Sequence, residues 1–189
     1  MTITLKKDQA ITLEKADHTP LGRIRLGLGW DAAKAGLFGR RKNIDLDASA
    51  ILISGQAALD IVYFNQTTSR DGAIQHSGDN VTGDGDGDDE QILVNLTALP
   101  DHIDKVVFVI TSYTGQTFDQ VENVYARVND IARYDDEIAR YNLADTTAKH
   151  TANVIAKITR EPSGWKFTAL GIPANAQMAK GLVGVALEA

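Results

Sequence analysis

The sequence contains no cysteine, which excludes a disulfide framework, a thiol nucleophile and thiolate metal sites. It has only four prolines, and no stretch approaches the roughly 18 apolar residues of a transmembrane helix. The first ten residues, MTITLKKDQA, hold no apolar run of the kind that a secretory signal needs, so we expect a cytoplasmic protein. A length of 189 residues with 43% hydrophobic residues suffices for one domain, residues 1–189, with its own core.

Negative charge is concentrated in one short segment. Between Gly78 and Gln91 the chain carries six acidic residues and no basic one: Asp79, Asp84, Asp86, Asp88, Asp89 and Glu90. The rest of the chain has 19 acidic residues, as many as Lys and Arg together, so this segment accounts for the whole net charge of −6. A non-specific nucleic-acid binder would carry a basic stripe instead. The basic residues within 34–42 are too few to argue from, and we expect no nucleic-acid partner.

Short runs in which apolar and polar residues alternate recur along the chain and predict β-strands. In residues 44–53 one face of the strand is apolar, and the other face carries a polar set. The apolar face holds Leu46, Ala48, Ala50 and Leu52, and the polar set is Asp45, Asp47 and Ser49. Amphipathic helices, which a parallel α/β fold requires between its strands, are missing. The pattern predicts an all-β fold, either an antiparallel sandwich or a barrel. The predicted strands are 2–5, 11–13, 23–30, 44–53, 59–64, 92–96, 105–112, 123–133, 137–142, 151–160 and 164–170.

The C-terminal stretch, residues 175–187, is the one plausible helix, with Asn175 as its expected N-cap. Gly181 and Gly184 weaken this helix by about 1 kcal/mol each. No internal repeat and no linker divides the chain, which agrees with a single domain.

The acidic segment GDNVTGDGDGDDE, residues 78–90, is where metal chemistry is expected. Carboxylates a few ångströms apart repel one another, and a hard cation removes that cost. Calcium takes 6–8 oxygen ligands, and the glycines allow carboxylates and carbonyls to converge on it. An EF-hand starting at Asp84 is excluded, because Asp89 stands where that loop needs glycine and Asn95 where it needs glutamate. The alternative is an acidic, solvated turn.

Catalytic motifs are weaker. The four histidines show no metal-binding spacing, and no G-x-S-x-G elbow is present. His76, three residues before Asp79, is interpreted as a surface residue. Magnesium-dependent phosphoryl chemistry would require a substrate pocket, of which the sequence gives no sign. We assign no catalytic residue and do not expect an enzyme.

The acidic segment resembles the signature of the TerD family, the tellurium-resistance and stress-response proteins of bacteria. About 180 residues share the family's order and spacing, and the insertion at residues 32–43 resembles the TerZ-like branch. The other segments that carry the resemblance are GLGWD (27–31), IDLDASA (44–50), VVFVITS (106–112), FDQVENVYARV (118–128), EIARYNL (137–143) and GWKFTALG (164–171).

Membership of this family implies a β-sandwich of two facing, mostly antiparallel sheets, here with a short C-terminal helix. It implies calcium as the bound cofactor at the acidic segment and a role in tellurite or chemical-stress resistance. It also implies protein partners in a membrane-associated stress complex, so that a cytoplasmic protein would reach the membrane through a partner. Nothing in the family's pattern assigns a catalytic residue.

The expected calcium ligands come from the acidic segment and from neighbouring strands. For the strand residues, a solvated strand face is the alternative. The candidates in the segment are Asp79, Asn80, Asp86, Asp88, Asp89 and Glu90, and those in strands are Asp31, Asp45 and Asp47.

Three functions stay open at this point. The first is a calcium-binding stress module whose loaded surface docks a partner. The second is a metal-dependent enzyme or anion-handling protein that uses the cation as a Lewis acid. The third is calcium that bridges the loop to anionic lipid, supplemented by the basic residues 34–42.

Overall fold

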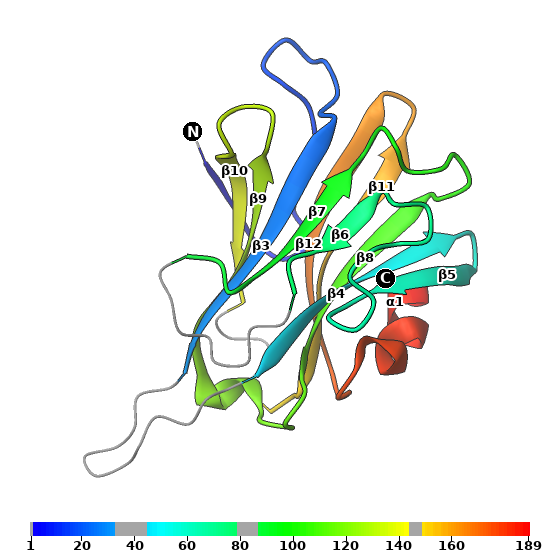
Figure 1. Ribbon diagram of the computed structural model, residues 1–189. Coiled ribbons are helices and arrows are strands. Elements are labelled where there is room, and N and C mark those ends of the chain that lie inside the picture. Colours follow the sequence, from blue (N-terminus) through cyan, green and yellow to red (C-terminus); the bar gives the residue numbers. More distant parts are fainter. Residues whose placement is uncertain (1, 33–44, 79–86, 144–148) are drawn as a thin grey trace.

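Two six-stranded β-sheets face each other in a sandwich (Figure 1). The computed structural model describes residues 2–32, 45–78, 87–143 and 149–189. Sheet A has the strand order β1-β10-β9-β3-β7-β6, and sheet B has the order β2-β12-β11-β8-β4-β5. The sheets are antiparallel except for β1, which pairs with β10 in parallel. The predicted sandwich of mostly antiparallel sheets is therefore confirmed.

The predicted strands are present with small shifts of their ends. One further strand, β6, is not among the predicted strands. The strands are β1 Ile3–Leu5, β2 Ala10–Thr12, β3 Arg23–Ala32, β4 Leu46–Ser54, β5 Ala57–Val62, β6 Ile74–His76, β7 Glu90–Asn95, β8 Lys105–Ser112, β9 Val121–Asp130, β10 Asp136–Asn142, β11 Ala152–Glu161 and β12 Gly164–Ala174. The helical elements are η1 Phe118–Gln120, η2 Ala179–Leu182 and α1 Val183–Glu188.

The main core lies between the two sheets. Leu26 and Leu28 of β3 and Ala50 and Leu52 of β4 belong to one buried apolar cluster, as the alternation in both sequences predicts. Fully burying a leucine or isoleucine side chain contributes about 1.5–3 kcal/mol, so this core is the main source of stability.

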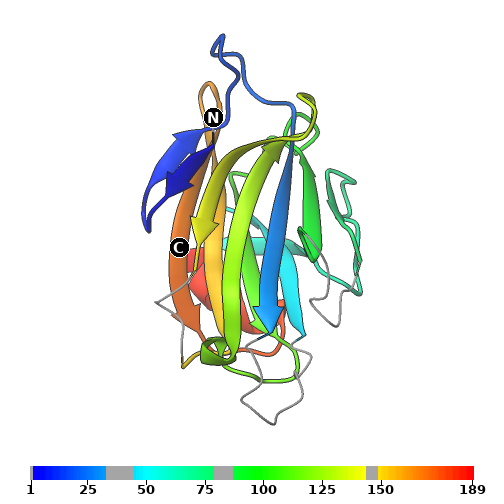
Figure 2. The same cartoon turned by 90° about the vertical axis from the view of Figure 1, so that its left-hand side faces the viewer.

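The C-terminal segment covers the other face of sheet B, as Figures 1 and 2 show. Leu182 and Ala186 pack against Ile51 and Val109, while Lys105 donates hydrogen bonds to the carbonyls of Leu187 and Ala189 at 3.1 and 2.9 Å. Strand β4 is therefore buried on both faces.

The C-terminal helix is shorter than predicted, and its expected N-cap is wrong. The helix begins only at Val183, after the 3₁₀ turn η2. Asn175 lies at the end of β12 instead, where its side-chain oxygen accepts a hydrogen bond from the N–H of Thr151. Within the described residues, no helix is long and apolar enough to span a membrane.

Candidate metal site

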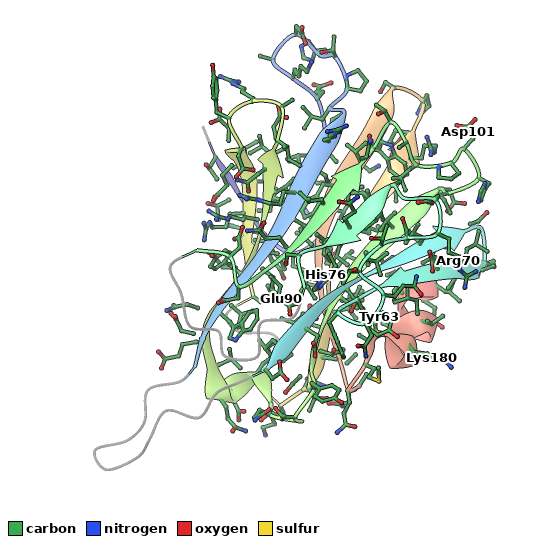
Figure 3. All side chains as sticks on the ribbon, in the orientation of Figure 1. Tyr63, Arg70, His76, Glu90, Asp101 and Lys180 are labelled. Carbon is green, nitrogen blue, oxygen red and sulfur yellow. The ribbon has the colours of Figure 1, made fainter. Side chains whose placement is uncertain are left out.

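Two buried side chains of sheet A reach the backbone of the same residue of sheet B, Ala48. Glu90, the first residue of β7, accepts the N–H of Ala48 on β4 at 2.6 Å through Oε2. His76, the last residue of β6, lies 3.0 Å from the Ala48 carbonyl oxygen through Nε2. The same His76 nitrogen is 3.3 Å from Glu90 Oε2, and neither side chain is exposed to solvent. Figure 3 shows both side chains between the sheets.

His76 also contacts the residue that precedes the acidic run. The N–H of Gly78 donates to His76 Nδ1 at 3.0 Å. The prediction that His76 is a surface residue is therefore wrong. Glu90 is the last residue of the acidic run, and His76 contacts Gly78 just before it. Because both side chains also contact Ala48, the residues at both ends of the run are held at the same buried position.

Asp89 lies where carboxylates crowd. Its Oδ2 accepts the N–H of Trp30 at 2.9 Å. Burial raises the pKa of Asp89, and the hydrogen bond from Trp30 opposes that rise without cancelling it. Three neighbouring carboxylates raise this pKa further: those of Asp31, Asp88 and Glu90. The carboxylates at this end of sheet A therefore repel one another even within the described residues.

Asp88 is held on the outer face of sheet A by two arginines. Its side chain is fully buried, and Oδ1 accepts a hydrogen bond from Arg127 Nε at 2.7 Å. Arg25 lies 3.8 Å from Oδ2, and the Tyr125 hydroxyl lies 3.5 Å from Oδ1. The Asp88 carboxylate is thus paired with arginine side chains from β3 and β9.

The remaining described candidates come from strand ends. Asp31, near the end of β3, is exposed and accepts a 2.7 Å hydrogen bond from Asn123. Asp45 is half-buried just before β4, and Asp47 within β4 is only 4% exposed. The alternative of a solvated strand face is therefore wrong for Asp47. Asp79, Asn80 and Asp86 lie outside the described residues.

The described candidates do not make a complete metal site. Outside the gaps at 33–44, 79–86 and 144–148, no three His, Cys, Asp or Glu side chains are grouped closely enough to hold an ion. A site at this end would therefore need oxygens from residues 79–86 or from the main chain. The donors nearby are carboxylates, which suit a hard cation such as calcium.

Sequence reasoning missed three residues that shape this region: His76, Arg25 and Arg127. Neither arginine belongs to a metal-binding or catalytic motif, and only the pairing of β3 with β9 brings both to Asp88. For His76, its place just before the acidic run was the available signal.

The sandwich and its acid-rich end define a class of β-sandwich protein with an anionic loop between β6 and β7. Residues 1–184 match the TerD domain, and the chain belongs to the TerD family. It is 42% identical over 175 residues to the tellurium resistance protein TerZ of Serratia marcescens, with 89% of each chain covered. It is 40% identical over 189 residues to the stress response protein SCP2 of Bacillus subtilis (strain 168), with 93% of this chain and 94% of the relative covered.

A solved relative confirms the fold. The crystal structure of a homologue of telluride resistance protein (TerD) from Streptomyces coelicolor A3(2) superposes with a TM-score of 0.69 at 25% identity. The match covers 86% of this chain and 95% of that chain. The resemblance drawn from the sequence is thus confirmed, and the chain belongs to a family of tellurium-resistance and general stress-response proteins.

Proposed function

We propose that this protein is a calcium-binding stress-response module that docks a protein partner when calcium is bound. The observation that carries the proposal is the crowding of carboxylates around Asp89, whose pKa is raised by burial and by three neighbouring acids. A divalent cation would relieve this repulsion, and relief of repulsion is a favourable contribution to binding. The acid-rich residues 79–86 belong to the same segment of the chain.

The chemistry of the donors supports calcium over softer metals. The chain has no cysteine, and both ring nitrogens of His76 lie against main-chain groups, so the available ligands are oxygens. We propose that Asp31, Asp45, Asp47 and Asp89 supply oxygens, together with Asp79, Asn80 and Asp86. Calcium accepts 6–8 oxygens in flexible geometry, which suits a glycine-containing segment.

Asp88 and Glu90 have other roles in this proposal, although the sequence predicts both as ligands. Arg127 already holds Asp88, and the Ala48 amide already holds Glu90. We propose that these two residues anchor the end of the acidic segment to sheet A and sheet B respectively.

The docking part of the proposal rests on charge. Six acidic residues between Gly78 and Gln91 account for the net charge of −6, so bound calcium would neutralise part of the protein's anionic end. Neutralisation removes the repulsion that would oppose contact with an acidic partner surface. We therefore propose a partner from a membrane-associated stress complex, in keeping with the family, and a cytoplasmic location for this chain.

A binding role is proposed rather than catalysis. Two hollows formed by described residues are lined by side chains other than the candidate ligands. One of 520 Å³ lies beside Glu14 and Asp130, and another of 520 Å³ lies beside Leu59 and Met178. Neither contains a candidate ligand, so they give no support to a substrate site at the proposed metal.

Calcium titration followed by calorimetry tests the proposal. We expect saturable binding that Asp86→Asn weakens at least tenfold, while the matched control Asp101→Asn, in the turn between β7 and β8, leaves it unchanged. Absence of binding, or equal isotherms for both variants, would contradict the proposed site. Calcium-dependent sedimentation with anionic vesicles in the absence of protein partners would instead favour the lipid-bridging alternative.

A further inference from the structure

Among the described residues, no strand pairs with β4 at Ala48 on the side away from β8. Its pairing with β5 starts at Ala50, which lies opposite Val62. A buried peptide group left without partners costs free energy comparable to a lost hydrogen bond. Glu90 takes the Ala48 N–H, and His76 approaches the Ala48 carbonyl, so two side chains of sheet A replace the missing strand.

The geometry fixes where the His76 ring carries its proton. An amide N–H can only donate, so His76 Nδ1 accepts from Gly78 and holds no hydrogen. The hydrogen of the neutral ring is then on Nε2, which faces the Ala48 carbonyl oxygen at 3.0 Å. The ring therefore joins the chain just before the acidic run to the edge of β4.

We infer that His76 and Glu90 form a clamp on Ala48 that positions both ends of the acidic segment for cation binding. The inference rests on the proposed calcium site and makes both residues positioning residues. Gly78 precedes residues 79–89 and Glu90 follows them, and both are held at Ala48, Gly78 through the His76 ring and Glu90 directly. Fixing the ends removes conformational freedom that the bound state would otherwise have to remove, which raises affinity.

The two contacts of the His76 ring can be separated by substitution. His76→Asn places a side-chain oxygen where Nδ1 stood and keeps the contact with Gly78, but it does not reach Ala48. His76→Gln places its amide where Nε2 stood and keeps the contact with Ala48, but it loses Gly78. Both remove one hydrogen bond from a buried site, so both should lower the melting temperature in chelator by similar amounts.

Calorimetric calcium titration of these variants tests the clamp. Residues that orient ligands typically change metal affinity 10–100-fold when mutated. Because either substitution breaks the link between Gly78 and Ala48, we expect both His76→Gln and His76→Asn to weaken calcium binding at least tenfold. Glu90→Gln keeps an acceptor for Ala48 but removes one of the carboxylates around Asp89, so we expect it to weaken calcium binding less than the ligand variant Asp86→Asn, which weakens it at least tenfold.

A calcium affinity for His76→Asn or His76→Gln within threefold of that of the original protein would overturn the inference, as would a loss for Glu90→Gln as large as that for Asp86→Asn. A measurement in the absence of metal tests the two contacts of His76 independently of calcium binding. In chelator, the ¹⁵N spectrum of the His76 ring should show a protonated Nε2 and an unprotonated Nδ1, and the Gly78 amide should exchange slowly. The opposite tautomer would refute the clamp. The expected tautomer without any calcium binding would refute the proposed function and the clamp's role in it, while leaving the contacts themselves intact.

Discussion

Asp88 lies directly over Gly27 on the outer face of sheet A, so that a Cβ at residue 27 would overlap the carboxylate. Arg127 and Arg25 approach the same carboxylate, and the carboxylate has no exposed surface. The missing side chain at Gly27 thus provides the space in which the acidic segment is pinned to its sheet. This contact connects the GLGWD segment with the acidic segment, and the two segments are about 60 residues apart in the sequence.

Replacing Gly27 by alanine should displace Asp88 from its arginines. Overpacking of this kind costs about 1–3 kcal/mol. We expect the free energy of unfolding in urea to fall by that amount, and calcium affinity to fall with it. Gly22→Ala is the matched control, because its Cβ would meet only Thr97 Cγ2, at an ordinary contact distance of 3.8 Å. Equal destabilisation by the two variants would show that Asp88 does not depend on the space at residue 27.

Asp88→Asn tests the ion pair itself. The substitution keeps the shape of the side chain but removes one of the two anionic partners of Arg127 and leaves Glu137 as the other. Hydrogen bonds to charged groups contribute about 1.5–3 kcal/mol, so we expect a loss in that range by chemical denaturation. Asp136→Asn removes the exposed pair with Arg133 and should cost less than about 1 kcal/mol. A loss for Asp88→Asn no larger than for Asp136→Asn would mean that the buried pair contributes little.

Asp89→Asn should have opposite effects with and without calcium. A carboxyl group whose pKa is raised in the folded state destabilises the fold when it is ionised at neutral pH. Neutralising residue 89 keeps an acceptor for the Trp30 N–H and removes repulsion from its neighbours. In chelator the variant should therefore melt at a higher temperature than the original protein, and in saturating calcium the order should reverse. A lower melting temperature in chelator would show that repulsion at this end is negligible.

Glu137 should contribute a pH-dependent part of stability. Hydrogen bonds from Arg140 lower its pKa more than burial raises it, and Arg127 lowers it further. A depressed folded-state pKa gives stability that is present above the unfolded value of about 4.3 and is lost as pH falls through the folded value. The difference in unfolding free energy between the original protein and Glu137→Gln should thus be largest at pH 7 and should shrink toward pH 3. Glu188→Gln, on α1 away from this cluster, is the control. A difference that is constant with pH would contradict the role of this carboxylate.

Much of the fold follows from the sequence, because burial on one face of a strand leaves a period of two. The pattern in residues 44–53 placed Leu46 and Leu52 between the sheets, as observed. It did not reveal that the opposite face of β4 is covered as well, since that cover comes from the C-terminal segment more than 120 residues later. Asp47 lies on that opposite face and is also buried. The alternation around it predicts a half-exposed strand, because a short sequence pattern does not show what packs against each face.

The candidate site is less predictable than the fold. The acidic run is visible as composition, and its resemblance to the TerD family is specific. The role of Ala48 is invisible in the sequence, because it contributes only its backbone N–H and C=O. Likewise, the arginines that hold Asp88 come from β3 and β9, which only strand pairing brings side by side. Side-chain type shows that this end is rich in carboxylates, and strand pairing decides which arginines meet Asp88.

Thermal melts in chelator, in magnesium and in calcium test the central claim most directly. A ligand that binds only the folded state at about 100 times its Kd adds about 2.7 kcal/mol to stability. Calcium should therefore raise the melting temperature clearly above that in chelator. Magnesium should substitute poorly, because it demands octahedral geometry and releases its waters reluctantly. If calcium and chelator give the same melting temperature, the acidic segment is a solvated turn and the calcium module is wrong.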